Sequence, residues 1–382
     1  MHYIRFLSPP KVVVDKSDIT LKTVIAITTD LGETFFPEDL ELVATIRESA
    51  DDGDVYLRRK LQWPAGARAL PINFNLSRND IEWPACLHVY VRQSPPASID
   101  YGGHGFLPPV VDIWSSPLNP TKGHFVSGPR VERRFVSLSE RPISLLEDAG
   151  DSIARHLWDG SQALCQYIDQ LICLQTPSQL PLLEYILVSA TYRRLNVLEL
   201  GCGCGTVGLA LAQMIPDCDV ILTDLPEVTE LVVANVDRLN PAMNSKVSFV
   251  PLDWEEPIPA RLRSRANDLI VVSECTYNAD TLQTLVNTLT AILERSPKAV
   301  IVVSTKTRHT SEAAFFGMMQ AAGIVQDSSV RVKLPGQPGD GYADWATDVG
   351  VHVFHGKGHR LSLSPRESEQ DVPRAQRSAR RS

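Results

Sequence analysis

A short apolar segment followed by three glycines at alternate positions restricts the fold of this chain more than any other feature. Residues 197–200 read Val-Leu-Glu-Leu and predict a strand, and Gly201, Gly203 and Gly205 predict a tight turn into a helix. Because glycine carries no side chain, such a turn lets the backbone approach a bound ligand closely. The feature therefore predicts an α/β fold with a cofactor site where the strand ends.

The glycines alone leave two classes of cofactor open. Residues 203–208 read Gly-Cys-Gly-Thr-Val-Gly, which also satisfies the pattern of dinucleotide-binding enzymes. Asp224, at the end of the next predicted strand, can accept hydrogen bonds from ribose hydroxyls in either class, or it can cap the following helix. Glu199 before the turn, together with Asp253 and Trp254 at the end of the third strand, favours S-adenosylmethionine over NAD.

The residues at the end of the third strand suit an adenine ring. Asp253 can accept a hydrogen bond from the adenine amino group, and Trp254 can offer the ring an apolar face. A tryptophan here can equally be a core residue, because buried tryptophans are common. No base and cation suited to hydride transfer follow this strand, so we expect S-adenosylmethionine to be the cofactor.

The spacing of apolar segments divides the chain into a β-rich part and an α/β part. Apolar and polar residues alternate in the first part and predict a turn at 51–53 and strands at 22–28, 40–47, 55–62, 72–76 and 87–92. After residue 196, apolar strands separated by helical stretches predict a parallel sheet; they are 197–200, 220–223, 247–251, 269–273 and 299–304. We expect a small, mostly β region at 1–125, a catalytic domain at 126–358 and a disordered Arg/Ser-rich tail at 359–382.

Further patterns complete the expected catalytic domain. Strand-like segments at 134–138 and 143–147 precede a helix with a core-facing apolar stripe, formed by Leu164, Tyr167, Ile168, Leu171 and Ile172. Near the end of the chain, residues 330–334 and 351–354 predict an antiparallel pair of strands.

Composition and charge limit the partners and the compartment. The chain has 43% hydrophobic and 21% charged residues, as folded domains do, and no apolar run near the roughly 18 residues of a membrane span. It lacks a secretory signal, so we expect the protein in the cytoplasm, with the nucleus as a second location. We expect a monomer. The net charge of −8 disfavours nucleic acid and suits a basic partner or a small molecule, although the tail is rich in arginine.

The cysteines predict neither a disulfide framework nor a metal site. They are odd in number and scattered in mostly apolar sequence, at Cys86, Cys165, Cys173, Cys202, Cys204, Cys218 and Cys275. Cys202 and Cys204 form a C-x-C, but no second pair of ligands follows at the spacing of a zinc site. We interpret these two as small residues of the tight turn.

Several motifs together resemble one known family. They are residues 157–160 (Leu-Trp-Asp-Gly), 199–205, 223–226 (Thr-Asp-Leu-Pro), 252–254 (Leu-Asp-Trp), 273–277 (Ser-Glu-Cys-Thr-Tyr) and 306–308 (Lys-Thr-Arg), then Glu312 and Phe315-Phe316. In this order they resemble the family 16 protein-lysine methyltransferases of the seven-strand class. The resemblance covers about residues 131–356 and leaves the first 125 unassigned, as a region that can dock a substrate.

The resemblance implies a fold, a cofactor and a site. The fold would be a Rossmann-like, seven-stranded class I methyltransferase sheet with helices on both faces and S-adenosyl-L-methionine at the carboxyl ends of the strands. Trp158 and Ser273 would belong to the cofactor pocket. The family's acidic-x-x-aromatic motif maps onto Glu274 and Tyr277, with glutamate where aspartate is commoner. The substrate would be a lysine side chain of a non-histone protein.

The two motif residues would handle the substrate amine. Glu274 would hold and orient the ammonium, and Tyr277 would line a narrow aromatic channel. Outside such a site, Glu274 would be a solvated or helix-capping carboxylate and Tyr277 a core aromatic.

Two other functions remain open on the same fold. A small-molecule amine can replace the lysine, because neither the glycine turn nor the ribose carboxylate selects an acceptor. Alternatively, the β-rich region binds a partner while the Rossmann-like domain has lost turnover. The presence of Glu199, the turn glycines, Asp224 and Glu274 counts against this second alternative.

Overall fold

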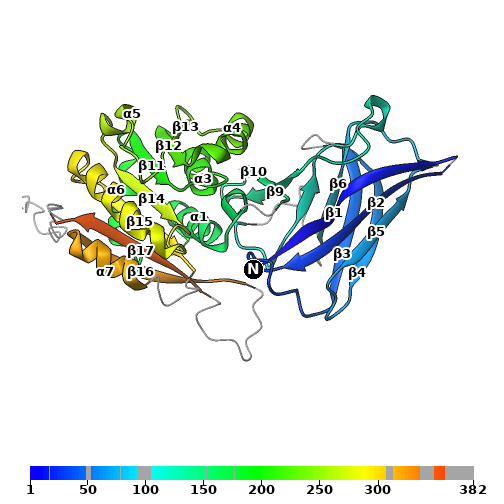
Figure 1. Cartoon of the computed structure of the whole chain (residues 1–382), viewed down its shortest axis with the longest axis horizontal. Helices are drawn as coiled ribbons and strands as arrows, with labels where there is room; N and C mark the ends of the chain where they lie inside the picture. Colours follow the sequence, from blue (N-terminus) through cyan, green and yellow to red (C-terminus); the bar gives the residue numbers. More distant parts are fainter. Residues whose placement is uncertain are drawn as a thin grey trace, which may run out of the picture.

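The computed structural model contains two domains that meet at the amino terminus and helix α1 (Figure 1). It describes residues 1–16, 18–48, 53–77, 79–92, 105–150, 153–175, 177–306, 313–335 and 348–357. Several sequence predictions lie outside these residues: the first two positions of the turn at 51–53, the motif residues Thr307, Arg308 and Glu312, and the tail at 359–382.

The N-terminal domain is a sandwich of two β-sheets. The four-stranded sheet has the order β5-β2-β1-β7, with β1 His2–Asp15, β2 Asp18–Thr28, β5 Leu70–Asn75 and β7 Val110–Val111. The six-stranded sheet has the order β10-β9-β8-β6-β3-β4, with β3 Leu40–Glu48, β4 Val55–Trp63, β6 Ala85–Val91, β8 Ile113–Ser115, β9 Arg130–Val136 and β10 Pro142–Asp148. Their inner faces share one apolar core that includes Ile25, Leu42 and Trp63.

Sequence periodicity missed the first strand of this sandwich. β1 carries Pro9 and Pro10 at its centre, and proline cannot donate a hydrogen bond to a neighbouring strand. The pairing of β1 with β2 shifts register between Phe6 and Lys11, so the two prolines lie in a bulge. The alternation that normally identifies a strand is interrupted there.

Strands β9 and β10 belong to the N-terminal sandwich by their hydrogen bonds. β9 pairs with β8 through Trp114 and Ser115, and β10 pairs along the whole of β9. Both strands follow the boundary that we predict at residue 125. The six-stranded sheet therefore extends to Asp148, close to the first helix of the second domain.

The second domain is built on a seven-stranded sheet with the order β13-β12-β11-β14-β15-β17-β16. Its strands are β11 Leu195–Leu200, β12 Cys218–Asp224, β13 Lys246–Pro251, β14 Leu269–Ser273, β15 Val300–Thr305, β16 Ile324–Lys333 and β17 Asp348–Gly356. The first five are parallel, and β17 is antiparallel to both of its neighbours. This is the class I methyltransferase sheet that the sequence predicts, including its antiparallel pair.

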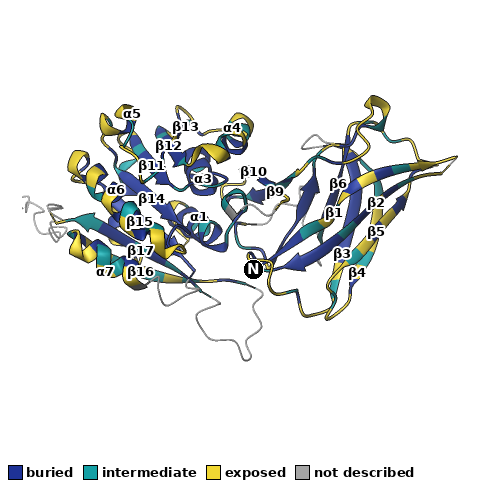
Figure 2. Cartoon of the chain, in the orientation of Figure 1, coloured by how far each residue is buried: buried dark blue, intermediate teal, exposed yellow. Residues whose placement is uncertain are grey.

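Helices cover both faces of this sheet (Figure 1). They are α1 Asp159–Ile172, α2 Pro181–Ser189, α3 Thr206–Met214, α4 Thr229–Arg238, α5 Ala260–Arg263, α6 Leu282–Arg295 and α7 Ala313–Ala321. Successive residues of a strand point to opposite faces of the sheet, and each face has its own apolar core. Val197 belongs to the core with α1 and α3, and Leu198 belongs to the core with α6. The central parallel strands β14 and β15 are accordingly buried along their length (Figure 2).

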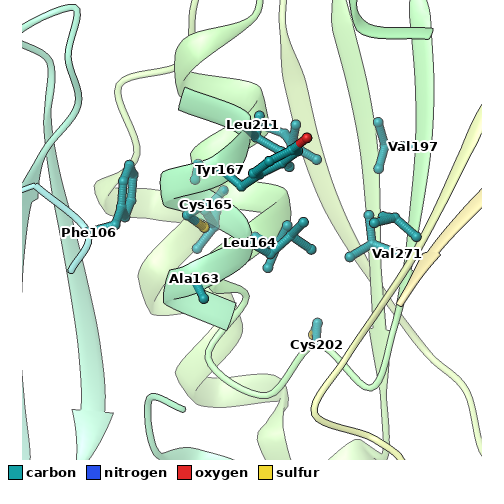
Figure 3. Packing of buried hydrophobic residues seen from close by; sticks show 14 of the residues in the cluster. Phe106, Ala163, Leu164, Cys165, Tyr167, Val197, Cys202, Leu211 and Val271 are labelled. Atoms are coloured by element: carbon teal, nitrogen blue, oxygen red, sulfur yellow. The ribbon is translucent and has the colours of Figure 1, made fainter. Parts of the chain in front are cut away.

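Helix α1 is shared by the two domains. In Figure 3, Leu164 and Tyr167 lie on the side of α1 that faces Val197 of the sheet, and Phe106 lies on its other side. The same core contains Tyr3 and other buried residues of the sandwich. The predicted stripe on α1 is buried except for Ile172, which is exposed because the helix ends there.

Candidate active site

A cavity of about 660 Å³ lies at the carboxyl ends of the central strands. The strands β12 and β13, which follow β11 in the chain, lie on one side of it, and β14 and β15 lie on its other side. In open α/β sheets, clefts form at such a switch point in strand order. Nine of the predicted site residues line the cavity: Trp158, Gly201, Gly203, Asp224, Asp253, Trp254, Ser273, Glu274 and Tyr277. They come from the residue before α1 and from the ends of four neighbouring strands and the loops that follow them, which the sheet brings to one edge.

Two predicted cofactor-binding residues, Glu199 and Gly205, are not part of the cavity wall. The carboxylate of Glu199 is buried behind the turn, where Oε2 accepts a hydrogen bond of 2.8 Å from the backbone N–H of Gly208. Burial raises the pKa of Glu199 to about 8. Gly205 is the residue before α3 and has φ of +81°. Both residues therefore belong to the turn on the side away from the cavity.

The turn needs glycine for conformation and for space. Gly201 and Gly203 have φ of +64° and +54°, in the left-handed region that disfavours other residues. A Cβ at Gly201 would lie 2.5 Å from Sγ of Cys275, and a Cβ at Gly203 would lie 2.9 Å from the carbonyl oxygen of Ala154. The turn is thus a close-packed backbone surface on the cavity, as a cofactor cradle requires.

Asp224 joins the end of β12 to the glycine turn. Its Oδ2 accepts a 2.8 Å hydrogen bond from the N–H of Gly203, and its Oδ1 accepts a 2.7 Å bond from the N–H of Leu225. Burial raises the pKa of this carboxyl above its usual value. The side chain does not cap a helix, since Leu225 is the residue before the next 3₁₀ turn. Each oxygen retains a lone pair that can accept from a hydroxyl in the cavity.

The end of β13 supplies one carboxylate and one aromatic surface. Oδ1 of Asp253 accepts a 3.0 Å hydrogen bond from the N–H of Glu255, which holds the side chain in place. Trp254 is half-buried against the core, and a Cβ at Gly201 would lie 3.3 Å from its ring. Trp254 therefore combines a packing role with a place in the cavity wall.

Glu274 follows β14 with an unusual backbone conformation. Its φ is +55°, and its N–H donates a 2.9 Å hydrogen bond to the carbonyl oxygen of Ser304 on β15. The side chain is only 8% exposed and lies against the backbone of Gly160, where a Cβ would approach Oε1 to 2.2 Å. Tyr277, which is 51% exposed, follows at the cavity rim and is not a core aromatic.

A row of serine hydroxyls crosses the site. The hydroxyl of Ser273 lies 2.9 Å from that of Ser161 on α1 and 2.8 Å from that of Ser304 on β15. Ser161 and Ser273 both line the cavity. These bonds connect the first turn of α1 with the strand ends that carry Glu274.

The cavity has a strongly acidic lining. Five carboxylates line it, from Asp224, Glu227, Asp253, Glu255 and Glu274, and none of its described lining residues is Lys or Arg. Low-dielectric walls that carry charges of one sign concentrate the field inside a cleft. The site therefore favours cationic ligands over polyanions.

Sequence reasoning missed several residues of the cavity wall: His156, Ser161, Glu227, Glu255, Asn278, Thr281 and Thr284. Position relative to a motif could have found some of them. Ser161 follows the Trp-Asp-Gly segment, and Glu227 and Glu255 each follow a predicted strand-end carboxylate by a few residues. His156 has no comparable signal, because it lies in the connection between β10 and α1.

Two kinds of feature are absent from the part of the chain that the structure describes. It contains no group of three or more His, Cys, Asp or Glu side chains arranged to hold a metal ion. None of its helices combines the length and the apolar character needed to cross a lipid bilayer.

Comparisons with known proteins identify relatives of the chain. A UPF0665 family protein of Schizosaccharomyces pombe is 27% identical over 82% of this chain and 91% of its own length. Protein-lysine N-methyltransferase EFM6 of Saccharomyces cerevisiae is 24% identical over 47% of this chain and 74% of its own length. The solved structure of N-methyltransferase NodS from Bradyrhizobium japonicum, in complex with S-adenosyl-L-homocysteine, is 18% identical, with a TM-score of 0.34 over 52% of this chain and 99% of that one.

A family model also matches part of the chain. The model described as lysine methyltransferase matches residues 137–322, which include α1, the glycine turn and the Glu274 motif. The two relatives from Saccharomyces cerevisiae, EFM6 and EFM2, are named protein-lysine N-methyltransferases, in agreement with this match. Residues 137–322 of this chain are therefore similar to the lysine methyltransferase family.

Proposed function

We propose that this protein is an S-adenosylmethionine-dependent N-methyltransferase that methylates a lysine side chain of a non-histone protein. The observation that carries the proposal is the carboxylate-lined cavity beside a tight glycine turn. A methyl-donating sulfonium and a lysine ammonium are both cations, and five carboxylates favour both. The family match and the yeast relatives support a lysine acceptor.

The residues of the cavity fit each part of the cofactor. Gly201 and Gly203 leave room for a ligand against the backbone, Asp224 has lone pairs for ribose hydroxyls, and Asp253 and Trp254 suit the adenine ring. When bound, S-adenosylmethionine supplies an electrophilic methyl group on a sulfonium. A dinucleotide would bring two phosphates into the same acidic lining, which disfavours it.

The acceptor must arrive neutral and aligned. A lysine amine has a pKa of about 10.4 in water, so it enters a neutral solution as the ammonium. Glu274 and Tyr277 both line the cavity; Glu274 would accept hydrogen bonds from that ammonium, and Tyr277 would contact its alkyl chain and charge. Holding the amine in line with the methyl group would supply much of the acceleration.

Calorimetric titration tests the cofactor. We expect S-adenosylmethionine and S-adenosylhomocysteine to bind the protein, and NAD to bind far more weakly. Asp224→Ala should weaken the first two by roughly 10- to 100-fold, because it removes hydrogen bonds that involve a charged group. Glu230→Gln, which alters an 89% exposed carboxylate on α4, is the matched control. Binding of NAD alone would refute the proposal.

An acceptor panel tests the substrate. Purified protein with radiolabelled S-adenosylmethionine is offered a cell extract depleted of nucleic acid, the same extract with its lysines chemically methylated, and small-molecule amines. We expect label on protein in the untreated extract only. Label on small amines alone would favour a small-molecule N-methyltransferase, and cofactor binding without any transfer would favour an inactive interaction protein.

A further inference from the structure

Four side chains from the two domains form a buried polar group beside the active site, which we call the interdomain cluster: Tyr3, Asp30, Asp159 and Lys306. The hydroxyl of Tyr3 donates a 2.9 Å hydrogen bond to Oδ1 of Asp159, and Nζ of Lys306 lies 2.7 Å from Oδ2 of Asp159. Nζ of Lys306 is also 3.5 Å from Oδ1 of Asp30. Tyr3 and Asp30 come from the sandwich, and Asp159 and Lys306 come from the methyltransferase domain.

The interdomain cluster adjoins both backbone segments that contact Glu274. Asp159 is followed by Gly160, whose Cα lies against the Glu274 carboxylate. Lys306 follows Ser304 and Thr305 on β15, and the carbonyl oxygen of Ser304 accepts the hydrogen bond from the N–H of Glu274. The Asp159–Lys306 ion pair therefore ties together the two backbone segments between which Glu274 is held.

A second bond on β15 strengthens this connection. The hydroxyls of Thr276 and Thr305 lie 2.9 Å apart, so the loop that carries Glu274 and Tyr277 is attached to β15 next to Lys306. Trp158 is the residue before α1, next to Asp159, and it lines the cavity. A displacement of the ion pair would thus reach the acceptor side of the site, where Glu274 and Tyr277 lie.

The buried ion pair of the interdomain cluster fixes the arrangement of neighbouring segments more than it adds to stability. The side chains of Asp159 and Lys306 are 0% and 9% exposed, and a buried ion pair contributes little net stability because desolvation offsets its attraction. Its best-attested benefit is a single specified arrangement of the groups that it joins. Here the joined groups fix the first turn of α1, the end of β15 and the sandwich relative to one another.

We propose that Asp159 and Lys306 are positioning residues for Glu274, and that Tyr3 and Asp30 make the β-sandwich part of the catalytic unit. This inference rests on the proposed methyltransferase function. It assigns the N-terminal domain a role in forming the site, in addition to any contact with a protein substrate.

Tyr3→Phe is the most selective variant, because it removes one hydroxyl and keeps the ring. We expect kcat for lysine methylation to fall about tenfold or more, since small displacements of a catalytic group are costly. The KM for the acceptor and the Kd for S-adenosylhomocysteine should change less than about twofold, because the binding surfaces persist. Lys306→Gln, which removes the ion pair, should have the same signature with a larger loss.

Arg238→Gln is the matched control for a lost interdomain contact. Arg238 on α4 bonds Ser144 and Glu132 of the sandwich, and it is not a lining residue of the cavity. We expect its kcat to equal that of the wild type. Equal kcat in Tyr3→Phe, Lys306→Gln and the control would overturn the inference while leaving the methyltransferase function intact.

Hydrogen exchange gives a readout that does not need turnover. The N–H groups of Ser161 and Gln162 bond the carbonyl oxygen of Trp158, and the N–H of Glu274 bonds Ser304. We expect these three amides to exchange faster in Tyr3→Phe and Lys306→Gln, and at the wild-type rate in Arg238→Gln. Unchanged exchange in both variants would refute the positioning role even if the wild type methylated no lysine, an outcome that would separately refute the proposed function.

Discussion

Glu274 shows how a single residue can carry conformational cost at a candidate site. A non-glycine residue at φ of +55° costs on the order of 1–2 kcal/mol relative to a standard conformation. The surrounding structure must therefore impose it, and it does so through the bond to Ser304 and the close contact with Gly160. The observed strain aims a carboxylate into the cavity, which supports a functional role for the residue.

The charge of Glu274 can be tested separately from its shape. Glu274→Gln keeps nearly the same volume and removes the carboxylate, so it should lower kcat by at least roughly 100-fold if the charge orients the ammonium. Affinity for S-adenosylhomocysteine should stay within about twofold, because the turn and Asp224 are unchanged. Full activity of Glu274→Gln in the lysine assay would remove Glu274 from the mechanism.

Glu199 predicts a pH dependence of stability. Its pKa is about 8 in the folded protein and about 4.3 when unfolded, so the folded state binds the extra proton between these values. The stability of the cofactor-free protein should fall by about 1.4 kcal/mol per pH unit from this group as pH rises from 5 to 8. Glu199→Gln should lose this slope in urea unfolding curves. Parallel curves for the variant and the wild type would contradict the assignment.

At the scale of elements, helix α3 packs closely against the sheet at Gly208. A Cβ on Gly208 would lie 2.4 Å from a methyl of Leu222 and 2.7 Å from Oε2 of Glu199. This close approach lets α3 begin directly after the turn while Glu199 bonds its backbone. The third glycine of the apparent dinucleotide pattern thus serves helix packing, which both classes of cofactor-binding fold require.

Two glycine-to-alanine substitutions in helices should act in opposite directions. Gly208→Ala should destabilise the protein by about 1–3 kcal/mol, because overpacking outweighs the gain in helix propensity. Gly317→Ala on α7 should stabilise it by up to about 1 kcal/mol, since a Cβ there meets nothing within 4 Å. Thermal and urea unfolding of both variants measure this contrast. Equal effects would contradict the close packing of α3 against the sheet at Gly208.

At the scale of the whole molecule, the two domains share one core and buried charges. The cluster of buried residues around α1 includes Tyr3, Phe106 and Phe135 from the sandwich side and Leu164 and Val197 from the methyltransferase side. Glu147 at the end of β10 pairs with Arg133 at 2.7 Å and accepts a hydrogen bond from the N–H of Leu157, next to Trp158. The sandwich is therefore attached to the segment that lines the cavity.

The buried carboxylates at this junction predict loss of stability in acid. Burial acts to raise the pKa values of Glu147 and Asp159, but neighbouring cations, Arg133 and Lys306 among them, outweigh it and hold both below their usual values. Their stabilisation is present above pH 5 and is lost as the pH falls through about 4 and lower. The urea midpoint should drop from pH 5 to pH 3, less steeply in Asp159→Asn. Glu41→Gln, at an exposed ion pair, is the control, and a flat wild-type curve would contradict the prediction.

The sequence alone determined the features that depend on near neighbours in the chain. Strand periodicity, the glycine turn and the residues that end each strand are local, so β11 to β15 and nine of the cavity residues were predictable. Local patterns failed where a strand was interrupted, as at Pro9 and Pro10 of β1. They also could not assign β9 and β10 to the sandwich, because partners of a strand are chosen by the sheet that it joins.

Only the tertiary structure decided which distant residues meet. Tyr3 and Asp159 are 156 positions apart and Lys306 and Asp159 are 147 apart, so no spacing in the sequence relates them. The side of the turn on which Glu199 lies was likewise decided by packing, because a buried carboxylate must find a donor and Gly208 supplies it. Turn chemistry and periodicity act within a few residues, whereas burial and pairing of charges depend on the whole fold.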